Sequence, residues 1–203
     1  MKDKIHHGLP GVCYGKRGEF LDAHIFKRNM IFTSEGKAIP NLNYDKSILT
    51  LAFLNSSLSQ YLINLYCGQH KHVGYVNILP IPSLNSKQQK EIIKNTESIL
   101  ELKKGNYSYD ETNLEYLGLL DRLPDLKPLK RSILKFKNIL KESHRRYENA
   151  ILNNDSIWIK ASGISEPALF HVEENKKNRP HEIIFFTNYF ESEEDFEQEI
   201  VNE

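Results

Sequence analysis

The sequence has few cysteines and no long apolar run, and both absences limit the class of protein. Its 203 residues contain two cysteines, Cys13 and Cys67, so a disulfide framework of the secreted type is excluded. The first residues are charged without a following apolar core, and the most apolar stretch, 48–67, is interrupted by polar residues. We therefore expect a cytoplasmic protein that keeps its thiols reduced, does not enter a membrane and buries a core of its own.

The loops that build nucleotide and methyl-donor sites are also missing. None of the eight prolines is adjacent to another, and no Gly-x-Gly-x-x-Gly motif follows a strand pattern. An enzyme that methylates a flipped base needs a glycine-rich turn for the methyl donor and a Pro-Pro-aromatic loop for the base. The segment Gly11–Lys16 approaches a phosphate-binding loop but is one residue short and continues into Arg17, so we interpret it as a turn.

Metal and acid–base chemistry have only weak candidates. Cys67, His70 and His72 are zinc-ligand types within six residues, but no second pair of ligands follows at a matching distance. Residues 101–103 have the local form of a nuclease motif on a predicted helix, and 110–111 fit the start of a helix. We predict no catalytic, cofactor-binding or metal-binding residue in this chain; the alternative for the Cys67 loop is a weak zinc site.

Net charge is absent from the whole chain but not from its parts. Lysine plus arginine is 27 and aspartate plus glutamate is 27. Residues 1–190 nevertheless carry +7, because seven acids stand in the last thirteen residues, which contain no lysine or arginine. A terminal run of like charges is usually a solvated tail; the alternative is a tail that mimics DNA or inhibits the protein. The seven acids are Glu191, Glu193, Glu194, Asp195, Glu197, Glu199 and Glu203.

Strand and turn signals dominate the first forty residues, and a helical period follows them. Short β-prone runs lie at 20–26 and 30–33, and the glycines before them indicate a loop. From Asp45, which can cap a helix, apolar residues recur at helical spacing until about Gly68. The run 73–79 then resembles a strand. Residues 1–82 therefore predict one compact α/β unit.

Helical patterns dominate the rest of the chain. Ser83 can cap a helix that ends at Gly105–Asn106, and further helical patterns cover 111–123 and 129–152, the second strongly basic. We expect an irregular segment with the acidic tail at 153–203. The predicted fold class is α/β (α+β): a small sheet-plus-helix domain at 1–82 followed by a helical spacer or docking region at 83–152.

Basic residues in the predicted turns of the first domain stand beside aromatic residues. Lysine and arginine on loops neutralise phosphates, and arginine or asparagine that reaches a base edge discriminates sequence. Such residues also occur on any soluble surface, so composition alone does not decide for DNA. The predicted DNA-binding residues are Lys16, Arg17, Lys27, Arg28, His70, Lys71 and His72.

An ordered series of motifs runs through the chain at 14–20, 31–39 (an IFS-x-x-G-like turn), 51–56 (with Leu-Asn-Ser), 74–82 (with Leu-Pro-Ile-Pro) and 109–116. The series resembles the target-recognition region of large adenine-specific DNA methyltransferases, of the BREX phage-defence type and the fused type II restriction–modification type. The resemblance spans residues 10–150, and its specificity lies in the order of pieces that are individually weak. The proline-containing segment 79–82, followed by the helical segment 88–93, is also similar to type I restriction specificity subunits.

The resemblance implies a DNA sequence-recognition module of an N6-adenine DNA methyltransferase in restriction–modification or phage defence. Its partners would be double-stranded DNA and a methyltransferase catalytic domain or subunit, which would bind AdoMet; no cofactor is implied for this chain. Asn55 and Ser56 are expected to hold the core helix in register, and the basic helix from Leu129 to follow the DNA backbone or dock on the partner. The alternatives are a non-DNA interaction module that uses residues 83–152 and the acidic tail, and an enzyme with its own active site.

Overall fold

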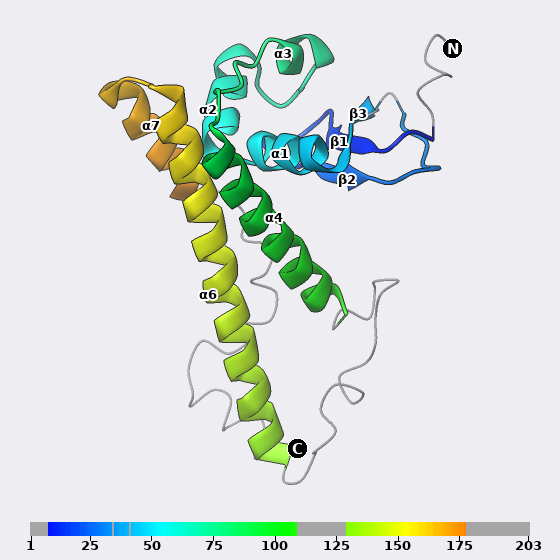
Figure 1. Cartoon of the computed structure of the whole chain (residues 1–203), viewed down its shortest axis with the longest axis vertical. Coiled ribbons are helices and arrows are strands. Elements are labelled where there is room, and N and C mark those ends of the chain that lie inside the picture. The colour runs from blue at the N-terminus through cyan, green and yellow to red at the C-terminus, as the bar shows by residue number, and fades with distance from the viewer. Residues whose placement is uncertain (1–7, 34, 41, 109–128, 178–203) are drawn as a thin grey trace. The chain divides into compact units, whose positions relative to one another are not determined.

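The computed structural model describes residues 8–33, 35–40, 42–108 and 129–177 (Figure 1). These residues form two compact units. The first combines the residues up to Glu97 with those from Ile151 onward, and the second combines Ser98 to Ser108 with Leu129 to Ala150. The domain boundaries that we expect at residues 82 and 152 stay a prediction about the function of each segment.

The sheet of the first unit has three antiparallel strands in the order β2-β1-β3. The central strand is β1 (Gly11–Gly15), which pairs with β2 (His24–Phe26) on one side and with β3 (Gly36–Pro40) on the other. The side chain of Val12, in the middle of β1, is fully buried. The small sheet of the predicted fold class is confirmed, although its strands are not the expected ones.

The glycines of β1 caused the error in the strand prediction. We expected a loop here and strands at 20–26 and 30–33, but only the end of the first run is a strand. A Cβ atom on Gly11 would stand 2.0 Å from the carbonyl oxygen of Ile39, so this glycine permits a close approach of β3. Glycine inside a strand commonly marks such an approach, and here it does not indicate a turn.

Two helices replace the single helix expected from Asp45 to about Gly68. Helix α1 (Tyr44–Leu54) lies along the sheet, and α2 (Ser57–Tyr66) follows after a break at Asn55 (Figure 1). The cap of α1 is Asn43, whose Oδ1 accepts a hydrogen bond from the Lys46 amide at 2.9 Å, and not Asp45. The buried apolar residues of the two helices include Ile48, Leu51, Phe53, Leu58 and Ile63.

Residues 73–77 form a short helix, α3 (Val73–Asn77), so the strand predicted over 73–79 is wrong. Val76 and Leu79 are buried while Val73, Tyr75 and Ile78 are exposed. A spacing of three between the buried positions belongs to a helical turn, and the apolar run was too short for its period to separate helix from strand.

Helix α4 (Ser86–Tyr107) begins at a reciprocal cap two residues beyond the predicted one. Asn85 Oδ1 accepts a hydrogen bond from the Gln88 amide, and Gln88 Oε1 accepts one from the Asn85 amide, both at 2.9 Å. This arrangement is a capping box, which pairs two amides that the helix would otherwise leave free. The helix runs past Gly105–Asn106, where we expected its end.

Most of residues 153–177 are helical, so the irregular segment expected at 153–203 is wrong for this described part. Helix α6 (Leu129–Ser162) extends ten residues beyond the predicted end and is followed by α7 (Glu166–Lys177). Gly163, with φ of +62°, stands immediately after α6, at the position where helices commonly end on a left-handed glycine. The predicted helix at 111–123, the Tyr109–Tyr116 motif and the acidic tail lie outside the described residues.

The core of the first unit is closed by residues of α6 and α7. The ring of Trp158 meets that of Phe53 edge to face with centroids 5.2 Å apart, and both side chains are buried. Val172 of α7 is also fully buried, and α7 lies beside α2. Asn154 of α6 also contacts α4, where its Nδ2 donates to Thr96 Oγ1 at 3.0 Å. No helix among the described residues is long and apolar enough to cross a membrane.

Candidate nucleic-acid interface

Two of the predicted DNA-binding turns lie side by side at one end of the sheet. Arg17 and His70 form an isolated antiparallel bridge. The Gly18 amide donates to the Gln69 carbonyl at 2.9 Å, and the Lys71 amide donates to the Lys16 carbonyl at 2.7 Å. Backbone pairing of this kind fixes the relative position of the two turns without depending on their side chains. Residues 16–18 and 69–71 are far apart in the sequence, and no sequence pattern predicted that they pair.

Two side-chain amides hold the loop that follows Arg17. Asn55 exchanges two hydrogen bonds with the backbone of Ala23, donating to its carbonyl and accepting from its amide, each at 2.9 Å. Gln60 accepts from the Leu21 amide at 3.3 Å and donates to the Glu19 carbonyl. The loop is therefore pinned to the α1–α2 junction and to the first turns of α2.

Asn55 and Ser56 have structural roles, as expected, but they separate two helices and do not hold one core helix in register. Both act on the backbone of the first unit: Asn55 holds the loop, and Ser56 caps α2 by accepting from the Ser59 amide at 3.1 Å. Ser56 Oγ also donates to the Phe53 carbonyl at 2.6 Å and is buried. Ser56 marks the break between the helices because its side chain bonds the Phe53 carbonyl at the end of α1 and the Ser59 amide at the start of α2.

Glu35 is a site residue that the sequence analysis missed. Its carboxylate lies 2.9 Å from Lys16 Nζ and 3.3 Å from Arg17 Nε. Its backbone carbonyl also accepts a hydrogen bond from the Lys16 amide at 3.0 Å. The hydrogen bond from Lys16, with the charges of Lys16, Arg17 and Lys37, lowers the pKa of the Glu35 carboxyl. An acid within the IFS-x-x-G-like turn was the only sequence signal for this role.

Lys71 differs from the other predicted DNA-binding residues because its side chain is fully buried. Its Nζ donates to the Gly68 carbonyl at 2.8 Å and to Asn64 Oδ1. Burial lowers the pKa of this ammonium from its ordinary value. The charge points into the protein, so Lys71 acts on the surface only through the loop that it holds.

An exposed group of aromatic rings surrounds the bridge. The rings of His70 and His72 have centroids 6.3 Å apart, and His72 stands 6.3 Å from Tyr75. Tyr75 in turn stacks on Tyr66 at 6.4 Å with 17° between the ring planes. Tyr66 is 52% exposed and Tyr75 37% exposed. We call these four residues with Arg17 the Arg17–His70 cluster; Tyr66 was not foreseen, because it belongs to the end of a core helix.

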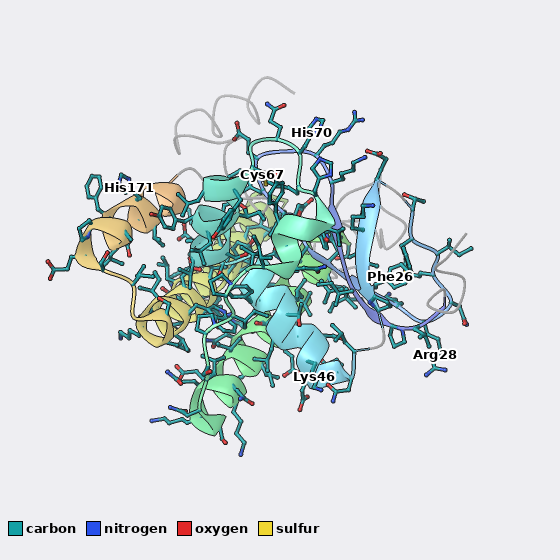
Figure 2. The ribbon with its side chains drawn as sticks, turned by 90° about the horizontal axis from the view of Figure 1, so that it is seen from above. Phe26, Arg28, Lys46, Cys67, His70 and His171 are labelled. Carbon is teal, nitrogen blue, oxygen red and sulfur yellow. The ribbon has the colours of Figure 1, made fainter. Side chains whose placement is uncertain are left out.

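Lys27 and Arg28 lie at the other end of the sheet. They follow β2, whose last residue, Phe26, pairs with Gly11 at the start of β1, whereas Arg17 lies beyond Gly15 at its end. Figure 2 shows Arg28 well apart from His70. Both basic residues of this turn are exposed. The structure therefore does not join the seven predicted residues into one patch.

The zinc alternative has no support among the described residues, where no three histidine, cysteine or acidic side chains could hold a metal ion together. Cys67 Sγ donates to the Ile63 carbonyl at 3.4 Å. On the basic helix α6, Arg145 forms a two-pronged pair with Glu142 at 2.8 and 2.9 Å, so part of its charge is offset locally.

Comparison with known proteins gives a structural match. No protein-family model and no curated protein sequence matches the chain. The fold is similar to that of the type IIL restriction–modification enzyme MmeI, whose structure was solved in complex with DNA. The TM-score is 0.54 at 16% sequence identity, over 85% of this chain and 22% of the MmeI chain. The expected likeness to restriction–modification enzymes is thus confirmed at the level of the fold, and the chain spans about a fifth of that protein's length.

Proposed function

We propose that the chain is a DNA sequence-recognition module of an N6-adenine DNA methyltransferase system used in restriction–modification or phage defence. The observation that carries the proposal is the Arg17–His70 bridge, which gathers an arginine, two histidines and two tyrosines on one exposed surface. Cationic and aromatic side chains together suit phosphates and bases. The fold shared with a protein solved on DNA supports the same function.

The proposed DNA surface keeps five of the seven predicted residues, and Lys16 and Lys71 support it from within the protein. Lys27 and Arg28 contact phosphates at one end of the sheet, and the Arg17–His70 cluster meets the DNA at the other end. Five residues of strand span roughly 17 Å at 3.4 Å per residue, so the two ends reach contacts about five base pairs apart on one duplex. Lys71 holds the loop between His70 and His72.

Methyl transfer in this proposal belongs to a partner. The sequence contains no methyl-donor loop and no base-flipping loop. The matched chain of MmeI is far longer than the part that corresponds to this chain. A separate catalytic domain or subunit would bind AdoMet, and this chain would place it over the target adenine in double-stranded DNA.

The test is binding of the full chain to random-sequence duplexes at salt concentrations from about 50 to 200 mM. Binding to phosphates makes log K fall linearly with log salt, with a slope of about −0.9 per phosphate bound. The double variant Lys27→Ala with Arg28→Ala should make the slope less steep by about 0.9 for each phosphate that is no longer bound. The matched control, Lys87→Ala with Lys90→Ala, removes two exposed lysines of α4 and should leave the slope unchanged.

Absence of DNA binding at low salt, both alone and with the catalytic partner, would exclude the proposed function. That result would favour the alternative, an interaction module that works through residues 83–152 and the acidic tail. Under the alternative, Lys16→Ala with Arg17→Ala would leave function untouched. Transfer of a labelled methyl group by the purified chain alone would contradict the assignment of catalysis to a partner.

A further inference from the structure

Glu35 changes what Lys16 and Arg17 offer to a ligand; the inference drawn from it rests on the proposed function. The Lys16 ammonium is 2.9 Å from one carboxylate oxygen of Glu35, and Arg17 Nε is 3.3 Å from the other. Thr33 holds the turn that presents Glu35, because its Oγ1 accepts from the Glu35 and Gly36 amides at 3.3 and 3.2 Å. The acid is therefore built into the site.

A carboxylate in this position opposes phosphate binding. A phosphate that approached Lys16 or Arg17 would meet the negative charge of Glu35 next to the positive charges that attract it. The Lys16 side chain is also mostly enclosed, with 23% of it exposed, and its ammonium is paired to Glu35. The ion pairs with Glu35 therefore weaken the attraction that Lys16 and Arg17 would exert on a phosphate.

The same carboxylate contacts Arg17 only through Nε and leaves its terminal N–H groups available to an uncharged hydrogen-bond acceptor. The ion pair engages the guanidinium through Nε, and 70% of the Arg17 side chain is exposed. Within the part of the chain that the structure describes, its two terminal nitrogens form no ion pair. The Arg17 backbone is held by its bridge to His70 and by the Gly18 hydrogen bond to Gln69. A held arginine whose terminal N–H groups remain available matches a pair of acceptors, and the adjacent Glu35 carboxylate favours a neutral pair over an anionic one.

We propose that Arg17 determines specificity by donating its terminal N–H groups to O6 and N7 of one guanine in the major groove. Guanine is the base that presents two acceptors side by side there, and a paired arginine contact is its commonest specific partner. Glu35 is a positioning residue that orients the Arg17 guanidinium through Nε. Lys16 fixes Glu35 and does not contact the DNA backbone.

Selection of binding sites from a random-sequence duplex library by the full chain tests this assignment. The wild-type chain should enrich guanine at one position of the selected site by about fivefold to a hundredfold, which is the discrimination that one paired contact provides. Arg17→Ala should abolish the enrichment at that position and leave the preferences at the other positions intact. Arg17→Lys should lose most of it, because a lysine lacks the planar pair of donors.

Glu35→Gln separates positioning from charge. It removes the anion, so non-specific affinity for DNA at low salt should rise or stay equal, while guanine enrichment at the Arg17 position should fall. A residue with a merely structural role would lower both together. The matched control Lys90→Ala, exposed on α4, should change neither. Thermal melting of each variant checks that it is folded.

Each contrary outcome has a definite meaning. If Arg17→Ala weakens binding equally for all sequences and makes the salt slope less steep by about 0.9, Arg17 binds a phosphate and the inference fails while the proposed function stands. If the wild-type chain binds DNA without a guanine preference at any position, the inference also fails. If it binds no DNA at low salt, alone or with the catalytic partner, the proposed function and the inference fail together.

Discussion

The carboxylate of Asp155 in α6 accepts two hydrogen bonds from Ser57, the first residue of α2. The Ser57 amide donates to Oδ1 at 2.9 Å and its hydroxyl donates to Oδ2 at 2.6 Å. Both residues are buried. The acid also lies at the N-terminus of a helix, where a negative charge is favoured by the helix dipole. This contact ties residues from beyond the expected helical spacer to the core of the first unit.

Asp155→Ala should destabilise the protein by about 2–4 kcal/mol, because it removes two buried hydrogen bonds to a charged acceptor. Urea unfolding followed by the fluorescence of Trp158, which lies in the same core, measures the loss of stability. Asp155→Asn keeps an acceptor for the Ser57 amide and should cost less. A change below about 0.5 kcal/mol for Asp155→Ala would contradict the role given to this pair.

Gly11→Ala should destabilise the sheet by about 1–3 kcal/mol, the usual cost of forcing extra atoms into a packed site. The new Cβ would meet the Ile39 carbonyl oxygen at 2.0 Å. Gly105→Ala is the matched control: it lies within α4, a Cβ there meets nothing within 4 Å, and alanine favours a helix by about 0.5–1 kcal/mol. Denaturant midpoints should therefore move in opposite directions for the two variants, and equal shifts would disprove the close approach of β1 and β3.

Asn55→Asp should destabilise the loop at Ala23 more than its near-identical shape suggests. Aspartate still accepts from the Ala23 amide, but it turns an oxygen toward the Ala23 carbonyl, where Asn55 Nδ2 donates at 2.9 Å. We expect a destabilisation of about 1–3 kcal/mol at neutral pH and faster hydrogen exchange of the Ala23 amide. Asn77→Ala, an exposed position in α3, should leave that exchange rate unchanged; if both variants behave alike, the clamp is not what orders the loop.

Lys71 should make stability rise with pH in the alkaline range. Burial lowers its pKa in the folded protein. Between that lowered pKa and the unfolded value of about 10.4, the unfolded chain binds more protons, so raising the pH favours folding. The contribution is fully present above the unfolded pKa and is lost as the pH falls through the folded pKa.

The Lys71 effect is measured as a difference between proteins, because other groups also titrate. The free energy of unfolding of the wild type minus that of Lys71→Met should increase as the pH rises from the lowered folded pKa towards the unfolded pKa of about 10.4. The same difference for Lys90→Met, at an exposed position, should stay flat. A flat profile for Lys71→Met as well would mean that the folded protein does not lower this pKa.

Local patterns predicted the helices whose period was long, although the caps expected at Asp45 and Ser83 are not those observed. The helical spacing between Asp45 and Gly68 correctly indicated helical structure, although two helices separated at Asn55 and Ser56 replace the single helix expected. Short apolar runs gave wrong predictions. Residues Val73–Asn77 form a helix with Val76 buried, and the run was too short for its period to separate helix from strand. The glycines of β1 gave a wrong prediction for a different reason. Glycine occurs both in loops and where two strands approach closely, and a single sequence does not distinguish the two.

The sequence by itself determined the types of group at the candidate interface and the general fold class, because cationic turns, helical periods and missing catalytic loops are local properties. Only the tertiary structure decided which groups meet. It joined Arg17 to His70, paired both Lys16 and Arg17 with Glu35, turned Lys71 inward, and separated Arg28 from the others. These relations depend on backbone pairing and burial between segments far apart in the chain, and no local pattern of residues encodes them.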